Sequence, residues 1–318
     1  MNKFGKIAAI VGACLLAFGA ICLFIGRLIG GVTTFSYVVG KNGAVVTDNN
    51  VITETVDLEP FDELIIDVAS IDVEVVKGDD YKFEMCVPEE LKAEITQNNN
   101  SLKIKEPKIN FSFNFNTNNL TQHIYYKVFV PDTDVIKTEI TSTSGDILVS
   151  DVNPSGKIIM TSGDGKITNI ESDNLNVQAT SGEIEIENGN IDNLDIETTS
   201  GDVNLKDVNS EKIKSHTTSG EMVYNNVSAD EMTSVSTSGD FDGSGIKAEV
   251  INVTCTSGEV EIDIVGKQSE YDYQIHTTSG DIKVGTVKTE HEYSTKENTG
   301  REICVDATSG NVSIDFAD

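Results

Sequence analysis

The residues best suited to chemistry are eight acidic side chains that recur at nearly constant spacing in the C-terminal half. Each directly follows a glycine: Asp146, Asp164, Glu183, Asp202, Glu221, Asp240, Glu259 and Asp281, with Asn311 at the ninth place. Hard cations such as calcium bind several carboxylate and carbonyl oxygens, so acids brought into one row could form a cation site. The alternative is a row of solvated turn acids, because the calcium-binding nonapeptide with paired glycines does not occur here.

Other groups that could catalyse a reaction or bind a metal are scattered. His216 and His276 both stand four residues before a repeated glycine, three repeats apart. Their separation is then about 14 Å if each repeat advances by the ~4.8 Å between strands, which is too far for a shared metal ion. Ser-Gly occurs in all nine repeats, whereas an enzyme needs one nucleophile. We therefore predict no catalytic and no cofactor-binding residue, and calcium is the one cofactor left open.

The five cysteines form neither a disulfide framework nor a metal motif. Cys14 and Cys22 lie in an apolar run near the N-terminus, and Cys86, Cys255 and Cys304 are scattered beyond it. An odd count at irregular spacing is not typical of a disulfide-stapled fold. No Cys-x-x-Cys or His-Glu-x-x-His pattern occurs, so we expect unpaired thiols.

The acids belong to a repeated tetrapeptide, Thr-Ser-Gly-acid. Its glycines are spaced by 18, 19, 19, 19, 19, 19, 22 and 30 residues: Gly145, Gly163, Gly182, Gly201, Gly220, Gly239, Gly258, Gly280 and Gly310. A fixed period of this length is the signature of a solenoid built from one small unit. The segments on either side of each glycine must therefore position the acids.

Both flanking segments alternate between apolar and polar residues. Apolar side chains stand seven and five residues before the glycine, as Leu194 and Ile196 do before Gly201, and again two and four residues after it. The period of two is that of a strand with one buried face. The buried parity changes at the glycine, which predicts a corner that needs positive φ or a close approach. A third apolar column follows an Asn or Asp turn position and comprises Val152, Ile170, Val208, Val227, Ile246, Val265 and Val287.

One repeat cannot bury a core alone, because two short strands are marginal in water. Stacking the repeats as parallel strands turns each apolar column into a continuous ladder, and nine corners then span about 40 Å. A β-propeller needs blades of about 40 residues, and the Leu and Asn pattern of a leucine-rich repeat is missing. The sequence therefore predicts a mainly β chain whose residues 139–318 form a parallel β-solenoid, or β-helix, of nine 19-residue coils.

Charge restricts the partners. The chain has 318 residues and a net charge of −29, with Arg27 and Arg301 as its two arginines. Such a surface repels nucleic acid and anionic lipid headgroups. We therefore expect no nucleic-acid partner.

Residues 1–30 read as a cytoplasmic tip and a transmembrane anchor. Lys3 and Lys6 precede nineteen residues, Ile7 to Ile25, without a charge or a proline, which is enough helix to cross a bilayer. The positive-inside rule then places the N-terminus in the cytoplasm and residues 31–318 outside the cell membrane, as a single-pass protein. A cleaved signal peptide, or a lipoprotein signal ending at Cys14, is the alternative.

Two further segments separate the anchor from the repeats. Residues 31–55 are predicted to be a polar linker, and residues 56–138 an irregular β region that caps the first coil. Within it, Asn110–Asn119 alternates Phe with polar residues, which indicates a hairpin or, alternatively, a binding loop. Near the other end, an insertion in Val287–Arg301 gathers Lys288, His291, Lys296 and Arg301; we interpret it as a capping excursion, with a functional loop as the alternative.

The strand block that begins at Phe61-Asp62-Glu63-Leu64 and is followed by iterated Thr-Ser-Gly-Asp coils resembles a known family. This is the bacterial putative-adhesin domain of unknown function, which is made of β-strand repeats, and the resemblance covers about residues 55 to 318. It implies an envelope protein, often membrane-tethered and in some members associated with envelope-stress systems. It carries over no functional residue, because the family pattern is structural.

Three functions are compatible with these observations. The first is a non-enzymatic, membrane-anchored binding or scaffolding module of the cell envelope, whose partner is an envelope protein or a polysaccharide. The second is an accessory protein of an envelope-stress sensing system. The third is a lyase or hydrolase acting on polysaccharide, since β-helices do host such enzymes. A cleft that holds acids together with Lys288, Lys296 or Arg301 would favour the enzyme, and a smooth rod would count against it.

Overall fold

The structure is a computed structural model that describes residues 34–40, 43–47, 51–108, 111–116, 123–131 and 136–317, with side chains for 51–108, 123–131 and 136–317. It contains two compact units. The predicted anchor, residues 1–30, lies outside the described residues. Among the described residues, no helix is long and apolar enough to span a membrane.

The smaller unit contains a three-stranded antiparallel sheet. Its strands are β1 (Thr34–Gly40), β2 (Gly43–Thr47) and β9 (Phe111–Asn116), in the order β2-β1-β9. The structure therefore bears on two expectations. The segment predicted as a linker contains strands, and the described part of Asn110–Asn119, Phe111–Asn116, is a strand whose partner is β1.

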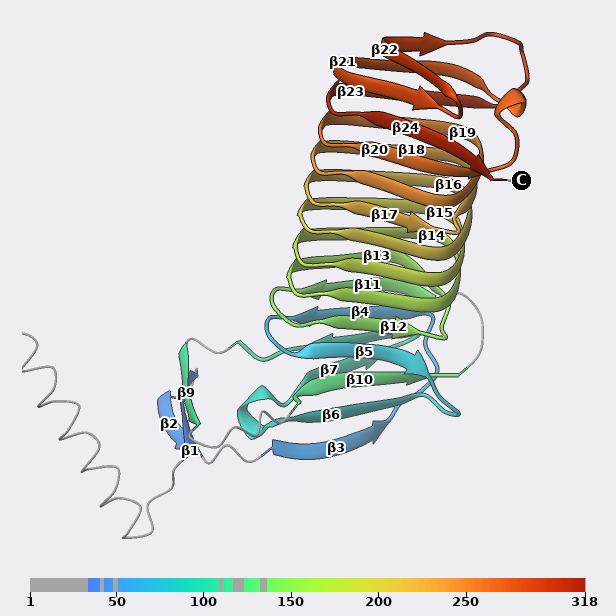
Figure 1. Cartoon of the computed structure of the whole chain (residues 1–318). Helices are drawn as coiled ribbons and strands as arrows, with labels where there is room; N and C mark the ends of the chain where they lie inside the picture. Colours follow the sequence, from blue (N-terminus) through green and yellow to red (C-terminus); the bar gives the residue numbers. More distant parts are fainter. Residues whose placement is uncertain are drawn as a thin grey trace, which may run out of the picture. The chain divides into compact units, whose positions relative to one another are not determined.

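The larger unit is dominated by a parallel stack of coils, each of which forms one rung (Figure 1). The strands of the middle coils are β11 (Ile136–Ser142), β12 (Ile147–Ser150), β13 (Pro154–Ser162), β14 (Gly165–Ser181), β15 (Ile184–Ser200), β16 (Val203–Ser219), β17 (Met222–Asn225), β18 (Ser228–Ser238), β19 (Phe241–Ser257) and β20 (Val260–Val265). From β14 to β19 the paired residues of successive coils are 19 positions apart, as Val177 and Ile196 are. The predicted β-solenoid is thus confirmed.

The core lies between the strands before and after each glycine. Leu194, Ile196 and Leu205 are 1%, 0% and 0% exposed, and their sequence neighbours point outward, as the period of two requires. The third apolar column is also buried over most of its length.

Two members of that third column do not follow the prediction. Val265 is 46% exposed and Val287 is 40% exposed. At Val265 the register shifts by one residue, so that Ile264 pairs with Ile246 and takes the buried place. Val287 begins an antiparallel strand rather than a coil.

The glycine corners are required by both criteria that the sequence suggested. Gly182 has φ +109°, and a Cβ atom there would lie 2.1 Å from the carbonyl oxygen of Gly163 in the coil below. A Cβ at Gly201 would lie 2.0 Å from the oxygen of Gly182. No side chain fits at such distances, so the close stacking of corners selects glycine.

The second corner of five coils uses Asn or Asp in the left-handed conformation. The residue six positions after the glycine has φ between 53° and 58° at Asp151, Asn169, Asn188, Asp207 and Asn226. Asn and Asp tolerate this conformation better than other side chains. The predicted Asn/Asp turn is therefore confirmed.

At the C-terminal end the coils are not stacked in sequence order. Here the strands are β21 (Asp272–Val284), β22 (Val287–Ser294), β23 (Glu302–Ser309) and β24 (Val312–Ala317). The last coil, β23 and β24, lies between its two predecessors, because β23 pairs in parallel with both β19 and β21. The 22-residue spacing before Gly280 contains the 3-10 turn η2 (Gln268–Glu270) and lets the chain climb past one rung. β22 pairs antiparallel with β21.

The N-terminal end of the stack is similarly interleaved. Its strands are β3 (Val51–Asp57), β4 (Glu63–Val68), β5 (Asp72–Lys77), β6 (Lys82–Pro88), β7 (Glu94–Asn98), β8 (Ser101–Lys105) and β10 (Tyr125–Val130), with the 3-10 turn η1 at Glu89–Leu91. β4 lies between β11 and β8, and β5 lies between β12 and β10, all in parallel. β7 and β6 then pair antiparallel with β8 and β10. Residues 56–138 are therefore more regular than the irregular cap we expected, because they add two parallel rungs.

Candidate functional site: the acidic ladder and the C-terminal groove

The eight predicted acids do lie in one row, which we call the acidic ladder. Their side chains are exposed at the glycine corner, and several of them bind the next coil. Asp146 Oδ1 accepts the backbone N–H of Asp164 at 2.8 Å, and Asp164 Oδ1 accepts that of Glu183 at 2.9 Å. Asp202 and Asp240 accept the N–H groups of Glu221 and Glu259 in the same way. The short aspartate side chain thus caps the corner of the following rung.

The ladder includes two residues besides the eight acids, Asp72 before the Thr-Ser-Gly repeats and Asn311 in the last of them. Asp72 Oδ1 accepts the N–H of Asp146 at 2.9 Å, a role that sequence reasoning missed because no Thr-Ser-Gly precedes Asp72. At the other end Asn311 lies between two acids. It donates to Glu259 Oε1 at 3.1 Å and accepts the N–H of Asp281 at 3.0 Å.

These contacts give the acidic ladder a structural role in satisfying corner N–H groups. In the parts of the chain that the structure describes, no three His, Cys, Asp or Glu side chains are grouped so as to hold a metal ion. Calcium binding by the ladder stays a prediction.

The two histidines of the repeats lie further apart than the sequence predicted, whereas the cysteines match the prediction. The row that joins His216 to His276 runs through Val235, Thr254 and Asp306. Four rungs therefore separate the two histidines, which corresponds to about 19 Å rather than about 14 Å. The three cysteines among the described residues, Cys86, Cys255 and Cys304, are all free thiols, as predicted.

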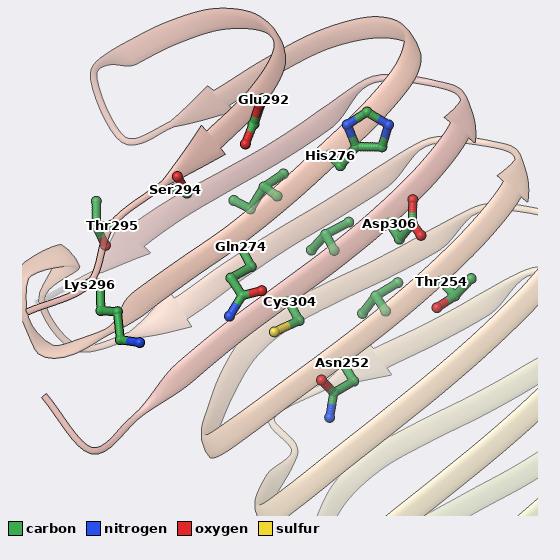
Figure 2. Close-up of a pocket in the computed structure, with 13 residues that line it drawn as sticks. Asn252, Thr254, Gln274, His276, Glu292, Ser294, Thr295, Lys296, Cys304 and Asp306 are labelled. Carbon is green, nitrogen blue, oxygen red and sulfur yellow. The ribbon is translucent and has the colours of Figure 1, made fainter. Parts of the chain in front are cut away.

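A groove of about 750 Å³ lies on the outer face of the C-terminal coils, over β19, β23, β21 and the end of β22 (Figure 2). We call it the C-terminal groove. Buried Val253, Val305 and Ile275 lie beneath its floor. The polar residues that line it are Asn252, Thr254, Gln274, His276, Glu292, Ser294, Thr295, Lys296, Cys304 and Asp306.

Thr295 and Lys296 form one wall of the groove, and the loop that they begin, residues 295–301, is tied to the start of β21. The Asp272 carboxylate accepts the N–H of Glu297 at 2.5 Å and that of Thr299 at 3.1 Å. These backbone hydrogen bonds, led by that of Glu297, lower the pKa of Asp272 below its usual value. Arg301 pairs with Glu270 at 3.1 Å and lies over the ring of Tyr271.

Polar side chains in the groove have unused hydrogen-bonding capacity. Within the described part of the chain, the side chains of His276, Glu292 and Asp306 have no hydrogen-bond or ion-pair partner. Outward side chains elsewhere on the stack often do pair from rung to rung, as Lys166 does with Glu185 at 2.6 Å and Lys283 with Asp315 at 2.6 Å. The groove therefore differs chemically from the rest of the surface.

Cys304 at the centre of the groove is not a ready nucleophile. Burial, followed by the charge of Glu302, raises its pKa to about 11. The thiolate is the reactive form of cysteine, so at neutral pH the side chain is a protonated thiol.

The positively charged residues predicted near this end are only partly brought together. Lys296 lines the groove. Lys288 lies on β22 opposite Lys283, and Arg301 is engaged by Glu270. The groove thus combines acids with one of the three cations that sequence analysis named, and the surface is not a smooth rod.

Fold and site together define a capped β-solenoid. Its parallel stack is closed by antiparallel strands, an acidic ladder runs along one corner, and a polar groove lies near one end. The family model Toastrack DUF4097 matches residues 61–315, and the chain belongs to this family of β-rich proteins. The family resemblance expected from the Thr-Ser-Gly-Asp coils is thereby confirmed.

Several solved structures are similar to this chain at low identity. A "putative adhesin" from Parabacteroides merdae is 15% identical, with 84% of this chain and 96% of that chain covered and a TM-score of 0.46. A second, from Parabacteroides distasonis, is 14% identical over 85% and 98%, with a TM-score of 0.47. A "putative lipid binding protein" from Parabacteroides distasonis is 16% identical over 85% and 97%, with a TM-score of 0.39. Among the curated proteins compared with it, none matches this chain.

Proposed function

We propose that this protein is a non-enzymatic binding or scaffolding module of the bacterial cell envelope, anchored in the cell membrane by its N-terminal segment. The apolar run behind Lys3 and Lys6 supports the anchor. The observation that carries the binding function is the C-terminal groove, where polar side chains without partners stand on a rigid sheet.

Ligand arrays test the groove as the binding site. Full-length protein, immobilised through an N-terminal tag, is probed with peptides and envelope polysaccharides. The double variant Asn252→Ala, Asp306→Asn should no longer bind the ligands that the wild-type chain retains. The matched control is Asp242→Asn, an exposed acid at the start of β19 and outside the groove. Equal retention by all three proteins would show that the groove is not the site.

Protease treatment of intact cells tests the topology. A tag at Asp318 should be removed from outside while the chain stays with the membrane fraction. Protection of the tag would contradict export, and release of the protein into the medium would contradict the anchor.

A polysaccharide-acting enzyme is a second candidate, favoured by one observation. The groove places His276 and Lys296 with the carboxylates of Glu292 and Asp306, and a lyase or hydrolase needs an acid or base in such a cleft. The test is release of unsaturated or reducing sugar ends from anionic and neutral polysaccharides. Under our proposal none is released, whereas turnover lost in both His276→Ala and Lys296→Ala would establish the enzyme.

A further inference from the structure

We propose that the C-terminal groove binds an extended peptide segment of a protein partner that carries a Lys or Arg and, four residues away, an acidic residue. The basic side chain lies over His276, beside the carboxylates of Asp306 and Glu292, and the acidic one contacts Lys296. This inference rests on the proposed binding function and names the class of its ligand.

The basic end of the peptide is specified by one row of side chains. His276 on β21 pairs in register with Asp306 on β23 and with Glu292 on β22. Side chains in register on neighbouring strands have Cβ atoms about 5 Å apart, so two carboxylates flank the imidazole. Both are without a partner among the described residues. The Cβ atoms of the two acids are then about 10 Å apart. An ammonium or guanidinium group above the imidazole has several N–H donors and can bind the carboxylate on either side.

The acidic end is specified by Lys296 on the wall. Gln274 pairs with Ser294, and continuing that register places Lys296 opposite Asp272, four residues along the strand from His276. Four residues of strand span about 13 Å. Residues i and i+4 of an extended peptide are separated by the same distance and face the same side. A peptide parallel to the floor strands therefore matches the charge spacing.

The middle of the groove suits the peptide backbone. Asn252 and Gln274 lie in one row on either side of Cys304. Gln274 Nε2 donates to Glu302 at 2.8 Å, which leaves its carbonyl oxygen available. Side-chain amides both donate and accept, as a peptide group does. Among the described residues that line the groove none is Phe, Tyr or Trp, so a sugar ring lacks the large aromatic face on which it usually stacks.

The experiment uses the full-length chain in detergent micelles and three blocked pentapeptides with a fluorescent label. The probes are Lys-Ser-Asn-Ser-Glu, Lys-Ser-Asn-Ser-Lys and Glu-Ser-Asn-Ser-Glu, compared at low and high salt. The first should bind tightest, and Asp306→Asn with Glu292→Gln should weaken it about tenfold. Lys296→Glu should transfer the preference to the peptide with two lysines, which loss of folding cannot do. Asp242→Asn and Lys247→Glu, both exposed and outside the groove, are the controls and should change nothing.

The outcomes separate this inference from the proposed function. If the three peptides bind equally, or if Lys296→Glu keeps the wild-type preference, the proposal of a peptide ligand with this charge spacing is overturned. If a neutral oligosaccharide is held by the wild-type chain and lost in the groove variants, the groove remains a binding site but its ligand is a glycan. If groove substitutions change the binding of no ligand at all, both proposals are overturned.

Discussion

The middle and the ends of the coil stack share parallel rungs, but the chain connects these rungs in different orders. From β14 to β19 each coil follows its predecessor in space and pairs with it at a spacing of 19 residues. At both ends an earlier or later coil lies between sequence neighbours. The middle is therefore held by local contacts, while each end depends on contacts that span tens of residues.

The difference shows how an open solenoid is closed. A free parallel strand exposes a row of unpaired N–H and C=O groups. In each end region the chain adds an antiparallel strand outside the last parallel rung, β7 and β6 at one end and β22 at the other. The returning chain then has to re-enter the stack one rung further in. The C-terminal groove is a product of this return, because Thr295 and Lys296, which line it, begin the loop 295–301 that carries the chain back.

The largest effect should follow removal of residues 302–318. These residues supply the rung between β19 and β21, including buried Ile303, Val305, Val312 and Ile314. At ~1.5–3 kcal/mol for each buried apolar side chain, the loss is on the order of 10 kcal/mol. Hydrogen exchange should show β21 and β22 unprotected while β14 to β16 stay protected. Unchanged protection in β21 would show that it takes the vacated place and that the two ends are less interdependent than we infer.

The interleaved ends could not have been predicted from the alternation of residues. Tyr273 and Ile303 occupy the same column, as do Thr277 and Ala307. The same positions therefore point into the core whichever of the two coils lies next to β19. The spacings of 22 and 30 residues indicated an irregularity. They could not say which coil lies next to which, because that choice depends on contacts between residues far apart in the chain.

A buried charge in the middle should have the next largest effect. Ile196 is 0% exposed and pairs with Val177 and Ser215. Ile196→Asp places an unpaired carboxylate there and should cost about 4 kcal/mol of unfolding free energy. The matched control is Asp195→Ala, the exposed neighbour, which should change the free energy by less than ~0.5 kcal/mol. Denaturant unfolding measures both, and equal effects would contradict the assignment of the buried face.

One departure from the apolar columns shows why packing details escape sequence reasoning. Ser215 and Ser234 occupy buried positions where neighbouring coils have Ile or Val. The Tyr224 hydroxyl donates to Ser215 Oγ at 2.6 Å, and burial raises the pKa of this tyrosine. Two small residues therefore accommodate one large ring from the facing strand. The pairing is evident only once the register is known.

A methyl group added at the glycine corner of a coil should have the third largest effect on stability. Gly182→Ala adds a Cβ 2.1 Å from the Gly163 oxygen at a φ of +109°, and a strained residue with backbone overlap should cost about 3 kcal/mol. Gly300→Ala is the control, since Gly300 has φ +87° but nothing within 4 Å; it should cost about 1 kcal/mol. Thermal unfolding compares them, and similar melting temperatures would show that close stacking does not select glycine.

Deletion of a whole middle coil should have a smaller effect than these. Removing Gly201 to Ser219 joins Ser200 to Gly220 and restores Thr-Ser-Gly-Glu in register. Solenoid stability is approximately a sum over neighbouring repeats, and 19 residues at ~0.1 kcal/mol each contribute about 2 kcal/mol. The shortened chain should unfold cooperatively at a slightly lower temperature. Loss of cooperativity would mean that the middle is not modular after all.

Of the two candidate sites, the acidic ladder could be predicted from the sequence and the C-terminal groove could not. The acidic ladder followed from a period of 19, because every acid holds the same place in its repeat. The groove did not, since Asn252, Gln274 and Cys304 meet only through the order β19-β23-β21. Functional side chains at an interleaved end cannot be aligned by their position in the repeat.

The smallest effect should come from single acids of the ladder. Asp164→Ala removes the acceptor of the Glu183 N–H and should cost about 1 kcal/mol. Asp164→Asn keeps an Oδ1 acceptor, as Asn311 does for Asp281, and it relieves repulsion between carboxylates of about 0.8 kcal/mol at 5 Å in water. We therefore expect Asp164→Asn to be neutral or slightly stabilising, and the wild-type melting temperature to rise with salt as that repulsion is screened.

Melting temperatures measured with and without calcium test whether the ladder also binds a cation. If the ladder binds it, millimolar calcium should raise the melting temperature beyond an ionic-strength-matched sodium control, because a ligand that binds only the folded state stabilises it. Glu183→Gln with Asp202→Asn should then abolish the excess. Since Asp146, Asp164 and Asp202 already direct one oxygen each to a backbone N–H, we expect the excess to be absent and the capping role to account for the aspartates. A calcium-dependent rise that survives Asp164→Ala but not the double variant would instead place a cation at the glutamates between them.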